Sequence, residues 1–556
     1  MEKTIKKQKN FLPVILTVVL IFLIVCPVVM IFARAVIIDG RLDLYHAWNT
    51  LRSSENVVMI GNSMLLGILV VIVSTIIAAP LAYLFSRTQF ARYKTFDIIF
   101  MVPFMTPPYI ASMGWILFMQ KRGLLQQLFP GTAGSENFFF SLGGLVLVMS
   151  LHVFPFMLTM LKNAMLNIPS SLEEAGAVFG AGFITKTCKI FLPLLSGNYA
   201  IGALLVFVKT ISEYGTPATL GKRIGFEVFT TEIHRHATVA PVDFGGSATL
   251  SSVLVGICLC LWMLQNYITT RKSYNLVSGK GSRTVLQKLR PVTKVLAWGY
   301  VILVILIAIG VPYFSVIATS LINLRGYGLA PGNFTIMHYI ELFSDNIKGI
   351  SALKNSFVLA VISATICAVL GTLIVVAVRS SGSRIGKIVE AIGLLPEMLP
   401  GIVLVIGIML FWNQIYNFIP LYNTMGIMVL AYVVLFLPYT IQYVTSSFTQ
   451  ISESLNAAGR VFGGTPGYVL LHITFPLIRP GIATGFMMTF IIAFRELVTA
   501  SLIAPPNTLV VSTYIMREFE QGSVSVGMAM AVLCVLFTTT ALLVLNTAIS
   551  RSTRRG

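Results

Sequence analysis

The chain of 556 residues is 56% hydrophobic and only 11% charged, and its mean hydropathy is +0.86. This apolar share is well above that of ordinary globular domains, so a soluble enzyme built around one large core is excluded. The net charge of +19 does not indicate nucleic-acid binding, because the Lys and Arg lie between apolar runs and not in one groove with stacking aromatics.

Apolar runs near the ~20 helical residues that cross a hydrocarbon core recur from one end of the chain to the other. The first run follows a basic N-terminal segment, but it is too long for a signal peptide and lacks a small-residue cleavage site, so we expect a retained span. The predicted spans are 11–33, 63–86, 96–119, 140–161, 200–217, 248–269, 295–320, 356–378, 388–412, 426–444, 482–503 and 528–550.

Charge sets the predicted orientation of these spans. Most of the 39 Lys and Arg fall in alternate connecting segments, and most of the 20 acidic residues fall in the others. The positive-inside rule then predicts that the basic segments and both chain ends are cytoplasmic, as in a multi-pass protein of a bacterial inner membrane. Of six Cys, only Cys188 lies outside an apolar run, so neither a disulfide nor a metal framework is predicted.

The segment 271–294 is polar, basic and Gly-containing, and it bisects the chain. It is typical of a linker between two domains. The sequence therefore predicts a first transmembrane unit at 1–270, the linker, and a second transmembrane unit at 295–556.

The two units are internal repeats. Pro103 and Pro107 recur 293 positions later as Pro396 and Pro400, and these prolines are expected to kink the third and ninth spans. An even number of spans separates matched positions, so the repeats share one orientation. The predicted fold is an all-α polytopic membrane protein with about 12 transmembrane helices in two parallel six-helix repeats.

A cytoplasmic loop between the fourth and fifth spans carries the most informative motif. Its sequence predicts a short helix that Ser170 or Ser171 caps, with acidic residues in the first turn and Gly180 and Gly182 in the turn that follows. A short helix with small residues, lying across the cytoplasmic ends of the spans, is suited to docking against another protein.

The loop resembles the signature loop of permeases in binding-protein-dependent ABC importers: Glu-Ala-Ala, three residues, Gly, nine residues, Ile-x-Leu-Pro. The matching residues of the first copy are Glu174, Ala175, Gly176, Gly180 and Pro193. Those of the second copy, 283 positions later, are Ala458, Gly459, Gly463 and Pro476. The leading Glu is replaced by Ala457 there, so weaker or differently wired coupling is expected.

The resemblance covers nearly the whole chain and is strongest to the fused ferric-iron-type permeases. It implies a type I importer permease without catalytic residues or cofactor, served by two copies of an ATP-binding-cassette ATPase and by an extracytoplasmic solute-binding protein. Segment 180–187 comes near a phosphate-binding loop but has Thr185 where Gly is required before Lys. Ferric iron is the first expected cargo; thiamine, phosphonate, phosphorylated sugar and polyamine are the alternatives.

Three carboxylates are candidate pathway residues, because ionisable groups within spans often line a pathway. Glu213 and Glu496 are equivalent at the 283-residue offset. Either both face the central axis, or Glu213 pairs with Lys209 and Glu496 pairs with Arg495 or with a neighbouring span. Glu397 marks either an asymmetric polar site in the ninth span or a hydrogen-bonded structural position.

The segment His234-Arg235-His236 suggests a metal site only weakly, because two His without regular further ligands are a poor set. A solvated external loop that touches the binding protein is the favoured interpretation. No arrangement of catalytic residues is recognisable, so a membrane-embedded enzyme is a distant alternative. An ion-coupled secondary transporter is the main rival, but it would leave the duplicated docking loops without a purpose.

Overall fold

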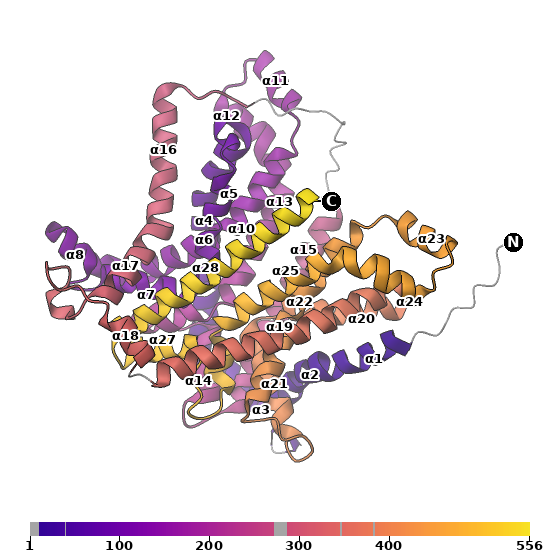
Figure 1. Cartoon of the computed structure of the whole chain (residues 1–556). Helices are drawn as coiled ribbons and strands as arrows, with labels where there is room; N and C mark the ends of the chain where they lie inside the picture. Colours follow the sequence, from indigo (N-terminus) through magenta and orange to yellow (C-terminus); the bar gives the residue numbers. More distant parts are fainter. Residues whose placement is uncertain (1–10, 39, 272–285, 345–346, 382–383, 556) are drawn as a thin grey trace. The chain divides into compact units, whose positions relative to one another are not determined.

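The computed structural model describes residues 11–38, 40–271, 286–344, 347–381 and 384–555, and they are almost entirely helical (Figure 1). A helix satisfies its own backbone hydrogen bonds, which a segment in hydrocarbon must do. Ten described helices are long and apolar enough to cross a membrane, and two sharply bent pairs bring the number to twelve if each pair is one span. Two strands of two residues each, β1 (Ile37–Ile38) and β2 (Arg41–Leu42), pair antiparallel.

The element bounds follow the chain, with η marking 3-10 and π segments. The first half contains α1 (Phe11–Leu20), η1 (Ile21–Val25), α2 (Cys26–Val36), α3 (Leu44–Arg52), α4 (Ser54–Arg87), η2 (Gln89–Arg92), α5 (Thr95–Ile99), α6 (Val102–Met105), α7 (Pro108–Met119), α8 (Leu124–Leu128), η3 (Pro130–Thr132), α9 (Ser135–Phe139), α10 (Leu142–Leu166), α11 (Ser170–Val178), α12 (Phe183–Lys186), η4 (Thr187–Phe191), α13 (Leu192–Ile211), η5 (Pro217–Gly221), α14 (Phe229–Thr238) and α15 (Phe244–Arg271). The second half contains α16 (Pro291–Ile305), η6 (Leu306–Gly310), α17 (Val311–Leu321), η7 (Arg325–Tyr327), α18 (Met337–Ser344), α19 (Ile347–Ser381), α20 (Arg384–Leu394), η8 (Leu395–Met398), α21 (Gly401–Gln414), α22 (Met425–Thr449), α23 (Glu453–Val461), α24 (Pro466–Val469), η9 (Leu470–Thr474), α25 (Phe475–Phe494), α26 (Val498–Ile503), α27 (Val511–Glu520) and α28 (Val524–Arg555).

The internal repeat is evident in these bounds. Helices α10 to α13 recur as α22 to α25, and every bound from Ser170 to Ile211 is displaced by the same 283 positions. Even the π segment before each proline-containing helix recurs, as η4 and η9. The predicted duplication is therefore confirmed at the level of single turns.

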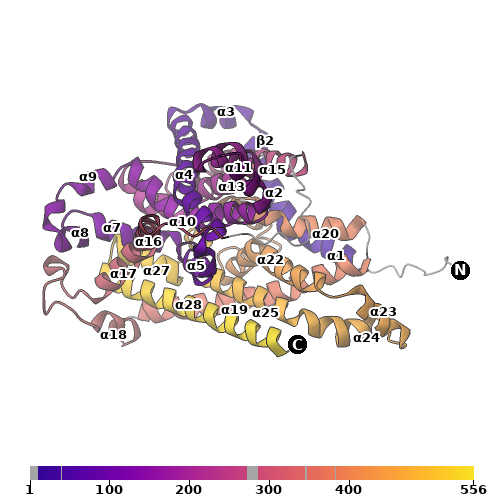
Figure 2. The ribbon, with the colours of Figure 1, turned by 90° about the horizontal axis from the view of Figure 1, so that it is seen from above.

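The chain forms two compact units, and they do not coincide with the two sequence repeats. One unit comprises residues 49–235 and 256–338, and the other comprises 1–48, 236–255 and 339–556. In the first of these, α4, α10 and α13 pack together; in the second, α19, α22 and α25 do the same (Figure 2). The bundle at the centre of each unit thus comes from one repeat.

The first span of each repeat packs in the unit built mainly from the other repeat. Helices α1 and α2 lie against α19, α20 and α21, whereas α17 lies against α7. Each contact has a glycine opposite a proline: a methyl group on Gly114 would lie 2.6 Å from Pro312 O, and one on Gly407 would lie 2.6 Å from Pro27 O. Small residues allow such close backbone approach in membrane proteins. The same glycine–proline contact therefore holds each first span in the unit built mainly from the other repeat, an arrangement we call the exchange of first spans.

The third and ninth spans are broken, as their prolines predict. The axis bends by 87° between Thr95–Met105 and Pro108–Met119, and by 113° between Arg384–Met398 and Gly401–Gln414. Pro107 and Pro400 are the residues at the breaks, where a missing N–H and the restricted residue before proline end the helix.

The predicted starts of the fifth and eleventh spans are wrong. Their helices begin well before residues 200 and 482, at Ile184 and Pro466. The prolines Pro193 and Pro476 suggested loop, but each stands at the start of an α-helix directly after a π segment, where a changed hydrogen-bond register accommodates the missing N–H. The last third of each signature loop is consequently helical.

Candidate functional site

Helices α11 and α23 stand at equivalent ends of their bundles, beyond α10 and α22 respectively (Figure 1). Both end in the same turn, in which Ala181 N donates to Gly176 O at 2.8 Å and Gly464 N donates to Gly459 O at 3.0 Å. The turn requires positive φ at Gly180 (+76°) and at Gly463 (+85°), a conformation that favours glycine.

A second glycine in each helix faces the helix that follows. A methyl group on Gly176 would lie 3.0 Å from Ile190 Cδ1, and one on Gly459 would lie 2.6 Å from Ile473 Cδ1. Both isoleucines belong to the Ile-x-x-Pro part of the signature loop. The motif therefore joins the two ends of its own loop, and the glycine in place of the usual second Ala makes room for the isoleucine.

The C-terminal tips of both helices expose a Val-Phe pair. Val178 is 84% and Phe179 89% exposed, and Val461 is 83% and Phe462 90% exposed. Large apolar side chains this exposed are typical of interaction sites. The recurrence of both pairs at the 283-residue offset is the sequence signal that marks them.

The other motif residues take two kinds of position. Glu174 and Ala175 on α11, and Ala458 on α23, are exposed on the same short helices. Pro193 and Pro476 are the second residues of α13 and α25 and are also exposed. The predicted Ser170 or Ser171 cap is wrong, because the N-cap residue of α11 is Pro169 and both serines lie inside the helix. The loop geometry is thus common to both repeats, whereas the caps differ.

At its base, α11 is held by an ion pair that the sequence did not suggest. Glu173 lies next to the motif Glu174 but points inward, and its Oε1 is 2.9 Å from Nη1 of Arg87, which is 1% exposed. From the sequence, Arg87 was expected only to be one of the basic residues that flank the second span on its cytoplasmic side. The sequence offset shows no charged counterpart, since Ser380 and Asn456 stand at the equivalent positions.

Glu213 and Glu496 lie directly after the ends of α13 and α25, where both helices break off. Glu213 accepts hydrogen bonds from Thr216 N at 3.1 and 3.0 Å. Glu496 accepts from Val498 N and Thr499 N, both at 2.8 Å. Each carboxylate therefore caps the turn that restarts the chain after the break, a third interpretation beside pathway lining and ion pairing.

Glu397 lies in η8, at the break of the ninth span, and accepts a hydrogen bond from Gln442 Nε2 of α22. Its side chain is exposed in the isolated chain. This contact supports the hydrogen-bonded structural interpretation, and whether Glu397 also lines a pathway stays a prediction.

The histidine segment 234–236 forms polar contacts on α14. His236 Nδ1 lies 3.5 Å and His46 Nε2 lies 3.6 Å from the carboxylate of Asp243. The hydrogen bond from His236 is the main reason that the pKa of Asp243 falls to about 2. Among the described residues, no group of three His, Cys, Asp or Glu is arranged to hold a metal ion.

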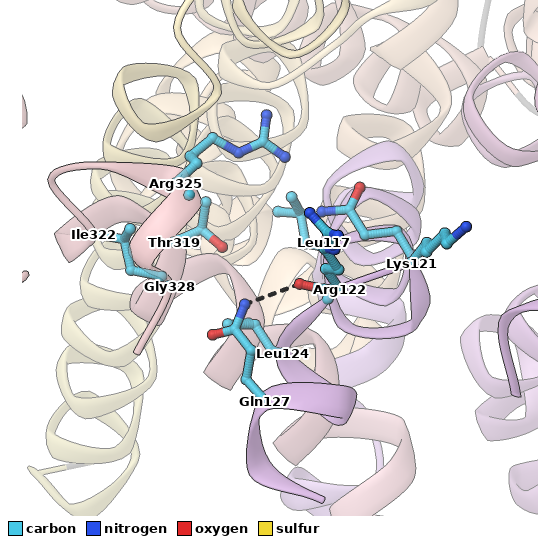
Figure 3. A pocket seen from close by; sticks show the side chains of 12 residues that line it. Leu117, Lys121, Arg122, Leu124, Gln127, Thr319, Ile322, Arg325 and Gly328 are labelled. Carbon is cyan, nitrogen blue, oxygen red and sulfur yellow. Dashed lines mark hydrogen bonds between the residues drawn. The ribbon is translucent and has the colours of Figure 1, made fainter. Parts of the chain in front are cut away.

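A pocket of about 320 Å³ lies between the end of α7 and the segment after α17 (Figure 3). Lys121, Arg122 and Arg325 are among its lining residues, and Gln127 Nε2 donates to Arg122 O at 2.9 Å. Three positive side chains repel a bare cation. The pocket is therefore unsuited to hold a metal ion.

Comparison with known proteins agrees with this duplicated loop geometry. Residues 368–555, which include α23 and its turn, match the family model described as binding-protein-dependent transport system inner membrane component. The second half of the chain is therefore similar to the permeases of this family. The chain is accordingly a multi-pass inner-membrane transport protein.

Individual permeases extend the similarity to both repeats. The chain is 25% identical to the ferric transport system permease protein FbpB of Actinobacillus pleuropneumoniae, over 95% of this chain and 76% of the relative. It is 23% identical to the Fe(3+)-transport system permease protein FbpB 2 of Haemophilus influenzae, over 93% and 95%. A putative 2-aminoethylphosphonate permease, PhnV of Salmonella typhi, is 23% identical over 40% of this chain and 84% of the relative. The chain is thus a fused permease with both repeats in one polypeptide.

Proposed function

We propose that this permease carries ferric iron, delivered by an extracytoplasmic binding protein, and that two ATP-binding-cassette ATPase subunits drive it. Relatives named as ferric permeases cover nearly the whole chain, whereas the phosphonate permease covers less than half of it. The pocket lined by three positive side chains, which repel a bare cation, agrees with a permease that takes its selectivity from the binding protein.

The observation that carries the ATPase assignment is the pair of exposed Val-Phe tips. Two identical apolar tips at equivalent ends of two repeats fit two copies of one partner. The positive-inside rule favours a cytoplasmic position for both tips and both chain ends, where ATP is available. We call α11 and α23 the first and second coupling helices.

Alternating access follows from this arrangement. ATP draws the ATPase subunits together, and the coupling helices carry that movement into the helices that begin at Phe183 and Pro466. Gly176 and Gly459 bring each coupling helix against the isoleucine of the same loop, so the movement is passed on through direct contact.

Reconstitution tests the proposal. Proteoliposomes contain this permease and a candidate ATPase subunit, and binding protein loaded with ferric iron is added outside. We expect loaded binding protein to stimulate ATP hydrolysis and ferric uptake, and unloaded protein or one loaded with thiamine to leave both at background. Stimulation by another cargo alone would refute the ferric assignment. Solute movement driven by an ion gradient without the ATPase would identify a secondary transporter.

A further inference from the structure

The first coupling helix has a buried polar base that connects it to three other segments. Arg87, the last residue of α4, pairs with Glu173 through Nη1, and its Nη2 donates to Met165 O and to Ile168 O, the latter at 2.7 Å. Its guanidinium also lies 5.5 Å from the ring centroid of Phe191 in η4. One side chain thus contacts the coupling helix, the end of α10 and the segment after the loop.

The linker between the repeats reaches the same ion pair. Gln287 N donates to Arg87 O at 2.9 Å, and Gln89 N donates to Gln287 O at 3.2 Å. The Gln287 side chain donates to Glu173 Oε2 at 3.3 Å and accepts from Tyr83 at 3.1 Å. Both carboxylate oxygens of Glu173 are therefore held, one by α4 and one by the linker.

The second coupling helix lacks the charges for such a base. At the repeat offsets, Ser380 stands in place of Arg87, Asn456 in place of Glu173 and Thr474 in place of Phe191. A buried ion pair is kept only where good geometry and further hydrogen bonds compensate its desolvation. Among the described residues such a pair is seen at the first coupling helix, and this points to a role in that helix's movement.

We propose that Arg87, Glu173 and Gln287 are positioning residues that make the first coupling helix move as one body with α4, so that the linker is part of the coupling path. The inference rests on the proposed function, in which an ATPase moves α11. The donors of a guanidinium form a rigid planar fork, so Arg87 holds its partners in a fixed relative orientation. Among the described contacts of the second coupling helix, Gly459 packs against Ile473 and Val469.

The test measures solute imported per ATP hydrolysed in the reconstituted complex, together with ATPase recruitment. Glu173→Gln is expected to lower this ratio about tenfold and Gln287→Ala about twofold, within the range found for residues along coupling networks. Lys288→Ala, a neighbouring exposed linker residue, is the matched control and should leave the ratio unchanged. A folded Glu173→Gln protein that recruits ATPase and keeps the wild-type ratio would overturn the inference.

If Glu173→Gln fails to fold, the double variant Arg87→Met with Glu173→Met removes both charges together and leaves no charge unpaired. A folded double variant with wild-type coupling equally refutes the inference. Spin labels at Ala177 and Arg92 give an independent readout: one narrow distance throughout the ATP cycle in the wild type, and a broadened one in the variant. A wild-type permease that recruits no ATPase contradicts the proposed function itself, which distinguishes the two failures.

Discussion

Helices α11 and α23 have the same length, end in the same glycine turn and expose the same Val-Phe pair, yet their bases differ. A glycine packs each helix against an isoleucine of its own loop. The base of α11 also has a buried ion pair with a linker contact, whereas the uncharged Ser380 and Asn456 stand at the equivalent positions of the second repeat. The motif Glu174 likewise has only Ala457 as its counterpart. Equivalent tips fit the proposed equivalent partners. Because the bases differ, we expect the same movement of a partner to displace the two coupling helices differently.

The largest expected effect comes from the turn after each coupling helix. Proline cannot adopt the positive φ of Gly180 or Gly463, and it removes a donor that bonds Ala177 O or Arg460 O. We expect Gly180→Pro to abolish uptake with membrane insertion intact, and Gly463→Pro to leave measurable uptake because α23 has neither the motif Glu nor the anchored base. Uptake into proteoliposomes checks this. Equal losses would show that the two loops contribute equally, and normal uptake by Gly180→Pro would contradict the coupling assignment.

Substitutions at the two exposed tips should have more similar effects than substitutions at the two turns. Phe179→Ser and Phe462→Ser each remove a large apolar contact worth about 1.5 kcal/mol, which is roughly tenfold in affinity for the ATPase subunit. Titration of the solubilised permease with the ATPase measures this. Phe418→Ser, at an equally exposed position in a loop predicted to be external, is the control and should leave binding unchanged. A large difference between the two tip variants would remove the symmetry on which the two-subunit stoichiometry rests.

A smaller difference between the two coupling helices is expected at Gly176 and Gly459, the glycines that face the isoleucines. Gly459→Ala should lower the free energy of unfolding by about 1 kcal/mol, because its new methyl group meets Ile473 at 2.6 Å and Val469 at 3.1 Å. Gly176→Ala should be nearly neutral, since a flexible Ile190 end lies at 3.0 Å and Ala favours the helix. Thermal unfolding in detergent measures both. Combining Gly459→Ala with Ile473→Val should restore stability; no restoration would refute the contact.

The smallest expected difference lies at the two capping carboxylates. Glu496 accepts from the N–H groups of Val498 and Thr499 through separate oxygens, whereas both Glu213 oxygens accept from the N–H of Thr216. Gln keeps one acceptor oxygen, so Glu496→Gln should destabilise by about 1 kcal/mol and Glu213→Gln by less. Thermal unfolding and uptake are measured together. Uptake that falls without any change in stability would favour the pathway interpretation for the residue concerned.

Apolar periodicity and proline positions predicted the repeats, the helical fold and the broken third and ninth spans, because these depend on local chemistry. The starts of the fifth and eleventh spans were predicted wrongly, since a π segment that admits Pro193 or Pro476 has no clear sequence signal. The ion pair of Arg87 and Glu173 was also beyond prediction. Its partners are 86 positions apart, and Glu173 resembled any acidic residue in the first turn of a helix.

The exchange of first spans has a consequence for the newborn chain. Helices α1 and α2 are synthesised well before their partner α21, which begins only at Gly401. At ordinary bacterial synthesis rates, roughly half a minute passes between the synthesis of α2 and that of α21. The glycine-facing surface around Pro27 is meanwhile open to lipid or to a chaperone of the insertion machinery. Biogenesis of this permease is therefore most vulnerable early, long before either coupling helix can meet an ATPase.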